Sequence, residues 1–264
     1  MPVLPTPLSA FYQPRRQWLV GGPDEGGLAL LPQFGAAGGR TLRPPNSYVL
    51  VFKQAGARKA LLIDAPLRHA LPGVRGLREE GVEIVGCLLT HADLAVRGDA
   101  YDALAAEFGL PFFLHPEDRH DPRVQGLLTE WEDPVEACEP GGPLAELPVE
   151  ALHWPGRTPG SVMLHTPKFG GVLLAGDSVI APGPMQPDDA PPLARPPAPP
   201  PPFSPTDDEV CDAWRTLLAR WETDGAPRTL APLHGAIHVD ADVPALVRGM
   251  LNTAPDMTGV RDTA

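Results

Sequence analysis

The chain has 264 residues, 43% of them hydrophobic, which is enough for a globular core without disulfide or metal staples. Its 33 acidic and 21 basic residues give a formal net charge of −12, which repels polyphosphate, so nucleic acid is not an expected partner. The cysteines Cys87, Cys138 and Cys211 form no Cys-x-x-Cys pair, and this disfavours a disulfide framework or a thiolate zinc site. No secretory leader pattern and no window of about 18 unbroken apolar residues is present, so we expect a cytoplasmic protein that does not bind a membrane.

The first half of the chain alternates strand and helix patterns. The predicted elements are a hairpin of strands at 47–52 and 60–63, a weak helix over 67–80, a buried strand over 84–89, a helix over 99–108 and a short strand at 112–114. The helix over 67–80 is weak because proline and glycine residues interrupt it. His91 is therefore expected just past the C-terminal end of a buried strand.

The second half repeats this alternation of strands and helices. Strands are predicted at 149–153, 161–165 and 171–175, and a helix follows Thr206, which with Glu209 forms a capping-box pattern. Between the last strand and that helix, the prolines of segment 182–205 exclude a helix or a central strand and predict an extended loop across or beside a pocket mouth. Two α/β halves of this kind predict a layered sandwich.

Three segments lie at predicted strand ends: Leu88-Leu89-Thr90-His91, then His153-Trp154-Pro155-Gly156-Arg157-Thr158-Pro159-Gly160-Ser161, then Leu173-Leu174-Ala175-Gly176-Asp177-Ser178. In this order they resemble motifs of the metallo-β-lactamase superfamily, which includes glyoxalase II-like hydrolases. Three further segments also resemble motifs of this family: Asn46-Ser47-Tyr48, Leu62-Ile63-Asp64 and Pro232-Leu233-His234-Gly235. The resemblance implies an α/β fold, the four-layer αββα sandwich, as a single domain over residues 1–264.

The resemblance also implies a site in which five histidines and two aspartates hold two metal ions, often zinc, that activate a bridging hydroxide. The family pattern Thr-His-x-His-x-Asp-His reads Thr90-His91-Ala92-Asp93-Leu94-Ala95-Val96 in this chain. His91 is retained, and Asp93 stands in the place of the second histidine. Ala95 and Val96 replace the family's aspartate and third histidine.

The second family motif, Pro-Gly-His-Thr-Pro-Gly, has Arg157 in the place of its histidine. A guanidinium cannot donate a lone pair to a metal. Asp177 matches the bridging aspartate and His234 the final histidine. The metal-ligand candidates are therefore His91, Asp93, Asp177 and His234, and the catalytic candidates are Asp93 and Arg157.

Two interpretations of Arg157 follow from this pattern. In the first, its charge replaces that of the metal and pairs with Asp177, or with both Asp177 and Asp93, in the bidentate geometry that guanidinium favours. Alternatively, Arg157 turns outward to bind an anionic substrate while one metal ion is held by the four candidate ligands. The first interpretation is favoured for two reasons. Without metal, the carboxylates of the site repel each other, and a fixed cation offsets this repulsion. In addition, Ala95 replaces an aspartate that the family's metal site uses.

The sequence thus predicts a degenerate metal site that lacks full dinuclear metallohydrolase activity and binds a small anionic ligand or another protein. The expected cofactor is none, or one weakly bound divalent metal, with zinc as the first choice. The alternative is a mononuclear-metal hydrolase of a small ester or thioester, so enzymatic activity stays open. A third hypothesis makes the proline-rich segment 182–205 a docking site for an aromatic-lined groove.

Overall fold

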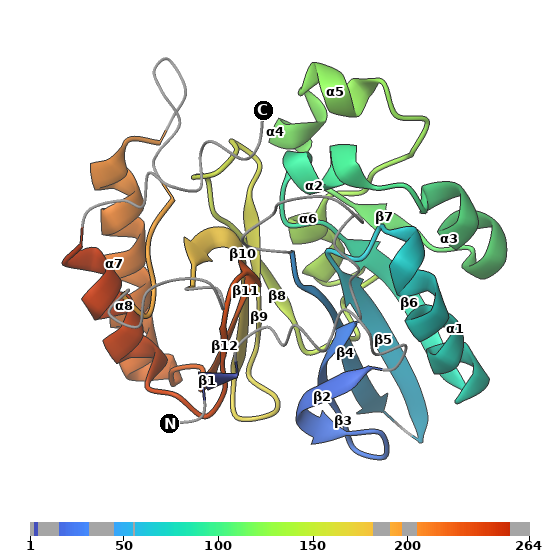
Figure 1. The fold of residues 1–264 in the computed structure, drawn as a ribbon, viewed down its shortest axis with the longest axis horizontal. Helices are drawn as coiled ribbons and strands as arrows, with labels where there is room; N and C mark the ends of the chain where they lie inside the picture. The colour runs from blue at the N-terminus through green and yellow to red at the C-terminus, as the bar shows by residue number, and fades with distance from the viewer. Residues whose placement is uncertain are drawn as a thin grey trace.

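The computed structural model describes residues 3–4, 16–31, 45–54, 56–181, 191–196 and 205–253. Two six-stranded mixed sheets pack face to face, with helices on their outer faces (Figure 1). The first sheet consists, in spatial order, of β2 Gln17–Gly22, β3 Gly26–Leu31, β4 Ser47–Gln54, β5 Ala57–Ile63, β6 Val82–Leu88 and β7 Phe112–Phe113. The second consists of β1 Val3–Leu4, β12 Ile237–His238, β11 Thr229–His234, β10 Val172–Ile180, β9 Val162–Thr166 and β8 Glu150–His153.

Helices from the two halves of the chain lie on opposite sides of the sheet pair (Figure 1). The first half contributes the 3₁₀ helix η2 Arg68–Ala70 and the helices α1 Leu71–Glu79, α2 Ala92–Arg97, α3 Tyr101–Phe108, α4 Pro116–Arg119, α5 Pro122–Gln125 and α6 Pro134–Cys138. The second half contributes α7 Asp207–Asp224 and α8 Val243–Leu251. The arrangement is the αββα sandwich expected from the sequence.

Three apolar layers hold the sandwich together. Strand β4 contributes side chains to two of these layers, because successive side chains on a strand point to opposite faces of the sheet. Tyr48 and Leu50 belong to the core between the two sheets, whereas Val49 and Val51 belong to the core beneath the first-half helices. The third core lies between the second sheet and helices α7 and α8 and includes the fully buried Trp214.

The two sheets are also joined by polar contacts near one set of strand ends. Asn46 Nδ2, just before β4, donates hydrogen bonds of 3.0 and 3.1 Å to the carbonyl oxygens of Pro232 and Gly235 around the end of β11. The Val162 backbone N–H, at the start of β9, donates to the Thr90 carbonyl oxygen at 2.8 Å. These contacts bring the loops after β6, β8, β10 and β11 to one place.

The elements predicted from the sequence are confirmed, with bounds shifted by a few residues, and the capping box at Thr206 is present. The structure adds elements that were not predicted: the hairpin of β2 and β3, the helices α2, α4, α5, α6 and α8, and the strands β1, β11 and β12. In the proline-rich segment, residues 191–196 contain no helix, and Ala194 forms an isolated antiparallel bridge with Ile180 of β10. The remainder of that prediction, 182–190 and 197–204, lies outside the described residues.

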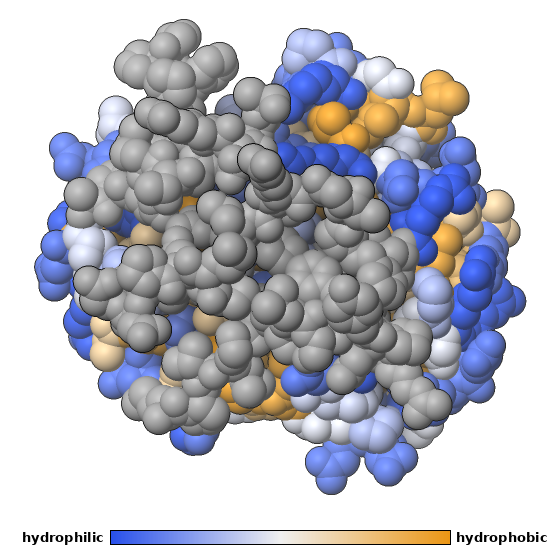
Figure 2. Space-filling model, in the orientation of Figure 1, coloured by the Kyte–Doolittle hydropathy of each residue, from blue (hydrophilic) through white to orange (hydrophobic). Residues whose placement is uncertain are grey.

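Two features of the surface complete the description. In the described parts of the chain, no helix is long and apolar enough to cross a membrane. Figure 2 shows hydrophobic residues reaching the surface near α4 and α5, and Leu128, which follows α5, is fully exposed.

Candidate functional site

His91 lies where the first sheet ends and α2 begins. It directly precedes the helix, has an extended backbone and is only 2% exposed. The Thr90 hydroxyl donates to Asp64 Oδ2 at 2.8 Å and lies 3.1 Å from His91 Nδ1. Because that hydroxyl donates to Asp64, its oxygen can accept from Nδ1–H of His91; in this tautomer the Nε2 lone pair of His91 faces the pocket.

Burial controls the titration of these groups. Burial raises the pKa of Asp64 to about 7. Two hydrogen bonds from Thr90 favour the charged carboxylate and act to lower this pKa, but burial outweighs them. It also lowers the pKa of His91, since an imidazolium is poorly solvated there, and the negative charge of Asp177 only partly offsets this. A neutral imidazole at His91 agrees with the tautomer set by Thr90.

Asp93, in the first turn of α2, is held by two arginines. Arg157, from the loop between β8 and β9, places Nη2 2.6 Å from Asp93 Oδ2, and the two side chains are 19% and 17% exposed. Arg123 of α5 places Nη2 2.9 Å from the other oxygen, Oδ1. Burial acts to raise the pKa of Asp93, but the charges of Arg157 and Arg123 outweigh it and the pKa is lowered. Both carboxylate oxygens of Asp93 are therefore engaged by guanidinium groups.

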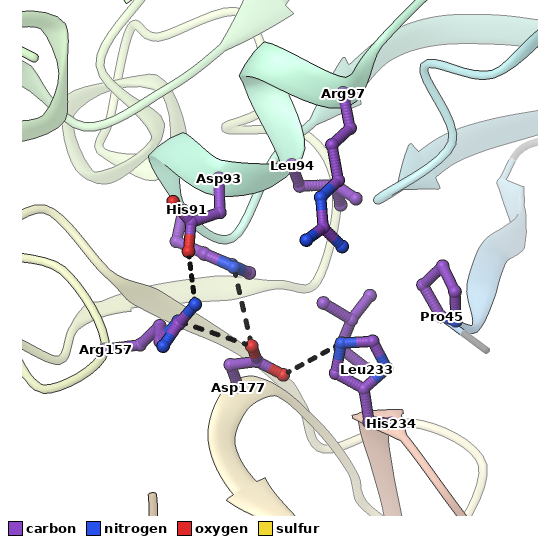
Figure 3. A pocket seen from close by; sticks show the side chains of 9 residues that line it. All are labelled: Pro45, His91, Asp93, Leu94, Arg97, Arg157, Asp177, Leu233 and His234. Atoms are coloured by element: carbon purple, nitrogen blue, oxygen red, sulfur yellow. Dashed lines mark hydrogen bonds and ion pairs between the residues drawn. The ribbon is translucent and has the colours of Figure 1, made fainter. Parts of the chain in front are cut away.

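Asp177 lies at the centre of the site, on β10 (Figure 3). Its Oδ2 atom is 3.6 Å from His91 Nε2 and 3.8 Å from Arg157 Nε, and its Oδ1 atom is 3.6 Å from His234 Nε2. His234 ends β11, which runs parallel to β10 and pairs with it. Asp177 thus faces two histidines and one guanidinium.

The bend that presents Asp177 depends on Gly176. This residue has a φ of +53°, at a register irregularity in the pairing of β10 with β11. A Cβ atom built there would lie 2.7 Å from the Thr90 side chain, which real contacts do not allow. A glycine is required at this position both for its backbone conformation and for the close approach of the two sheets.

The side chains described above line one small pocket (Figure 3). Its lining is Pro45, His91, Asp93, Leu94, Arg97, Arg157, Asp177, Leu233 and His234. Among the residues that the structure describes, three buried polar atoms of this pocket have no hydrogen-bond partner: Arg157 Nε, Asp177 Oδ1 and His234 Nδ1. Buried polar groups are nearly always hydrogen-bonded in folded proteins, so three such atoms in one pocket indicate a site for a further polar partner.

Solved structures share this architecture. The structure of DIM-1 metallo-β-lactamase matches 90% of this chain and 97% of its own, at 16% identity and a TM-score of 0.56. A metallo-β-lactamase from Erythrobacter litoralis matches 89% and 93%, at 14% identity and a TM-score of 0.55. The chain has the metallo-β-lactamase fold. No protein-family model and no curated protein matches it.

The metallo-β-lactamase fold brings the residues selected from the motifs into one pocket. The contact between Arg157 and Asp93 is present, but the expected bidentate geometry is wrong. One guanidinium nitrogen binds Asp93, and Nε faces Asp177 at a longer distance, because Arg123 already occupies the second oxygen of Asp93. Within the described ranges, no three His, Cys, Asp or Glu side chains are arranged to hold a metal ion. The assignment of ligand and catalytic roles stays a prediction.

Three residues of the site were missed from the sequence: Arg97, Arg123 and Asp118. Asp118 in α4 is 2% exposed, and its Oδ2 atom accepts from the backbone N–H of Ala92 at 2.6 Å and from the Thr158 hydroxyl at 2.7 Å. Its Oδ1 atom accepts from the Gly160 N–H at 2.7 Å. Asp118 therefore ties the start of α2 to the loop that contains Arg157. In the sequence it resembles any acidic residue in the first turn of a helix.

We expect Asp118→Asn to lower the free energy of unfolding by about 2 kcal/mol, as for the loss of hydrogen bonds to a charged acceptor. An amide has one accepting oxygen, so it cannot serve the donors on both sides of Asp118. Urea denaturation of the variant and the parent measures the difference. Asp102→Asn, at an exposed position in the first turn of α3, is the matched control and should change stability by less than about 0.5 kcal/mol. Equal effects of the two substitutions would contradict the role given to Asp118.

Proposed function

We propose that the protein binds a small anionic ligand in this pocket and lacks full two-metal hydrolase activity. The observation that supports this best is the position of Arg157, a guanidinium in the motif position of a metal-binding histidine. It lies 2.6 Å from Asp93 and 3.8 Å from Asp177. Its permanent charge neutralises carboxylates that would otherwise attract a cation, and it has no lone pair to offer a metal.

The donor groups that remain do not fit a two-metal centre. Each histidine faces only Asp177, at 3.6 Å, and both oxygens of Asp93 are engaged by arginines. A catalytic zinc takes three protein ligands and a water, and the described residues contain no such group of three. We therefore derive no reaction step through a metal pair.

The unpaired polar atoms of the pocket support the binding of a ligand. Arg157 Nε is a buried donor with no hydrogen-bond acceptor in the described part of the chain, and the oxygen atoms of an anion are acceptors. Asp177 Oδ1 is a buried acceptor with no hydrogen-bond donor in the same ranges, so the ligand, or a water molecule bound with it, would also supply a hydrogen. A small molecule with both kinds of group satisfies the pocket better than a simple ion.

A second candidate function is a mononuclear-metal hydrolase of a small ester or thioester. The hydrogen bond between Thr90 and His91 Nδ1 favours it, because it leaves the Nε2 lone pair free and directed toward Asp177. His91, Asp177 and His234 would hold such a metal after a shift of their side chains, and the metal would acidify a bound water. Arg157 would then bind the anionic part of the substrate.

Metal analysis distinguishes these two candidates. Protein purified without chelator and without a metal-affinity step is expected to contain well under one equivalent of zinc, manganese or iron per chain, because Arg157 excludes a complete ligand set. Two tightly bound equivalents would overturn the proposed function. One equivalent that is lost in His91→Ala, but kept in the control His120→Ala, would establish the mononuclear alternative.

Expectations about other partners and about location stay predictions. The net charge of −12 disfavours nucleic acid, and a cytoplasmic location is expected from the sequence patterns. A protein partner in place of a small ligand, or a groove that binds the proline-rich segment, is a weaker proposal. Neither accounts for the buried unpaired atoms of the pocket as directly as a small anion does.

A further inference from the structure

We infer that the ligand is a monocarboxylate and that Arg97 binds its carboxylate group. This inference rests on the proposed function and specifies its ligand. Arg97 ends α2, four residues after Asp93, so it lies one helical turn away on the same side of the helix. It lines the pocket, and Figure 3 shows its guanidinium directed from α2 into the pocket.

Arg97 is the uncommitted cation of the pocket. Arg157 and Arg123 are both engaged by Asp93, whereas Arg97 has no hydrogen bond or ion pair within the part of the chain that is described. Its side chain is exposed, so its guanidinium is free to bind a ligand that enters from solvent. A guanidinium presents parallel N–H groups that match the two oxygens of a carboxylate.

The charge balance of the site favours a ligand with a single negative charge. Arg123 is shared between Asp93 and Asp121, so the three carboxylates of Asp93, Asp121 and Asp177 face the guanidinium groups of Arg157 and Arg123, and Arg97 adds the third positive charge. Each negative charge that a ligand brings is therefore repelled by carboxylates that are already present. A dianion such as phosphate brings two charges close to Asp177, where a partly desolvated like-charge contact is costly, and a monoanion brings only one.

The walls of the pocket favour an organic anion over an inorganic one. Pro45, Leu94 and Leu233 line the pocket; the two leucines are almost fully buried, so the partly exposed Pro45 supplies most of the apolar surface. A sulfate or phosphate has no apolar part to place there. A short hydrocarbon body would contact these residues while its carboxylate binds Arg97. A hydroxyl on that body would reach the unpaired Asp177 Oδ1 as a donor.

The test is a titration of the full chain followed by two-dimensional ¹H–¹⁵N NMR, with propionate, 2-hydroxypropionate and inorganic phosphate as probes at constant ionic strength. We expect both carboxylates to shift the backbone signals of α2 and of the end of β11, and phosphate to bind at least tenfold more weakly. Arg97→Gln should raise the Kd for propionate at least tenfold and leave Tm unchanged. Arg215→Gln, on the exposed face of α7, is the matched control and should leave both quantities unchanged.

Each contrary result has a separate meaning. Phosphate that binds as tightly as propionate, and depends on Arg97, would overturn the carboxylate assignment and leave anion binding intact. Propionate binding that is unchanged in Arg97→Gln would overturn the role of Arg97 alone. If none of the probes shifts the pocket signals, both this inference and the proposed function are wrong.

Discussion

Replacement of Arg157 by alanine is expected to lower the free energy of unfolding by about 3 kcal/mol, at the lower end of the cost of breaking a buried ion pair. The substitution leaves Asp177 without its nearest cation in a poorly solvated pocket, and Asp93 with Arg123 alone. Carboxylates in such a site repel each other, and the folded state loses the group that offset this. Because Arg123 still contacts Asp93 in the variant, the loss in free energy of unfolding stays near the low end of the range for a broken buried ion pair.

Urea denaturation at neutral pH measures this loss, and a double-mutant cycle with Asp93→Ala assigns it. The coupling between Arg157 and Asp93 should exceed about 1 kcal/mol, as expected of residues in direct contact. Arg215→Ala removes an exposed i,i+3 pair with Asp212 and should cost less than about 0.5 kcal/mol. An Arg157→Ala variant with the denaturation midpoint of the parent would show that the guanidinium does not replace the charge of an ion.

The second large effect is expected from Arg157→His, which should recover stability only when zinc is supplied. The substitution restores an imidazole beside His91 and Asp177, where the sequence motif has a metal ligand. Zinc that binds the folded chain alone stabilises it by mass action, by about 2.7 kcal/mol at a free concentration one hundred times its Kd. Without zinc, the variant should resemble Arg157→Ala.

Thermal unfolding with and without zinc measures this effect, and zinc stoichiometry identifies its source. Arg157→Gln, which removes the charge without adding a ligand, is the matched control and should not respond to zinc. Addition of His91→Ala to Arg157→His should abolish the response. If zinc stabilises the parent as much as the histidine variant, the arginine does not exclude the metal, and the mononuclear function gains support.

Most of the sandwich was predictable because its strands alternate with helices and end at clear turns. The β4–β5 hairpin and the buried strand β6 were found from apolar runs bounded by glycine or proline. The hairpin of β2 and β3 was missed because its glycines, at 21–22 and 26–27, resemble a loop. Gly21, Gly26 and Gly27 adopt conformations and close strand contacts that only glycine allows, a requirement set by the neighbouring strand rather than by local sequence.

The composition of the site was predictable only where motifs gave it. Three motif segments indicated His91 with Asp93, Arg157 and Asp177, and the later segment 232–235 indicated His234. The structure gathers all five side chains in one pocket. Arg123 and Asp118 were not, because they reach the site from short helices whose position depends on tertiary packing. For the same reason the geometry of Arg157 was mispredicted.

The pair between Arg157 and Asp93 has a consequence for the cooperativity of folding. Asp93 follows a strand of the first sheet, and Arg157 lies between two strands of the second, so the pair spans two halves of the chain. Separation of the sheets would expose both charges without their partners. Neither half alone could therefore form the pocket, and a fluctuation that loosens the packing between the sheets would disrupt the pocket before either sheet unfolds.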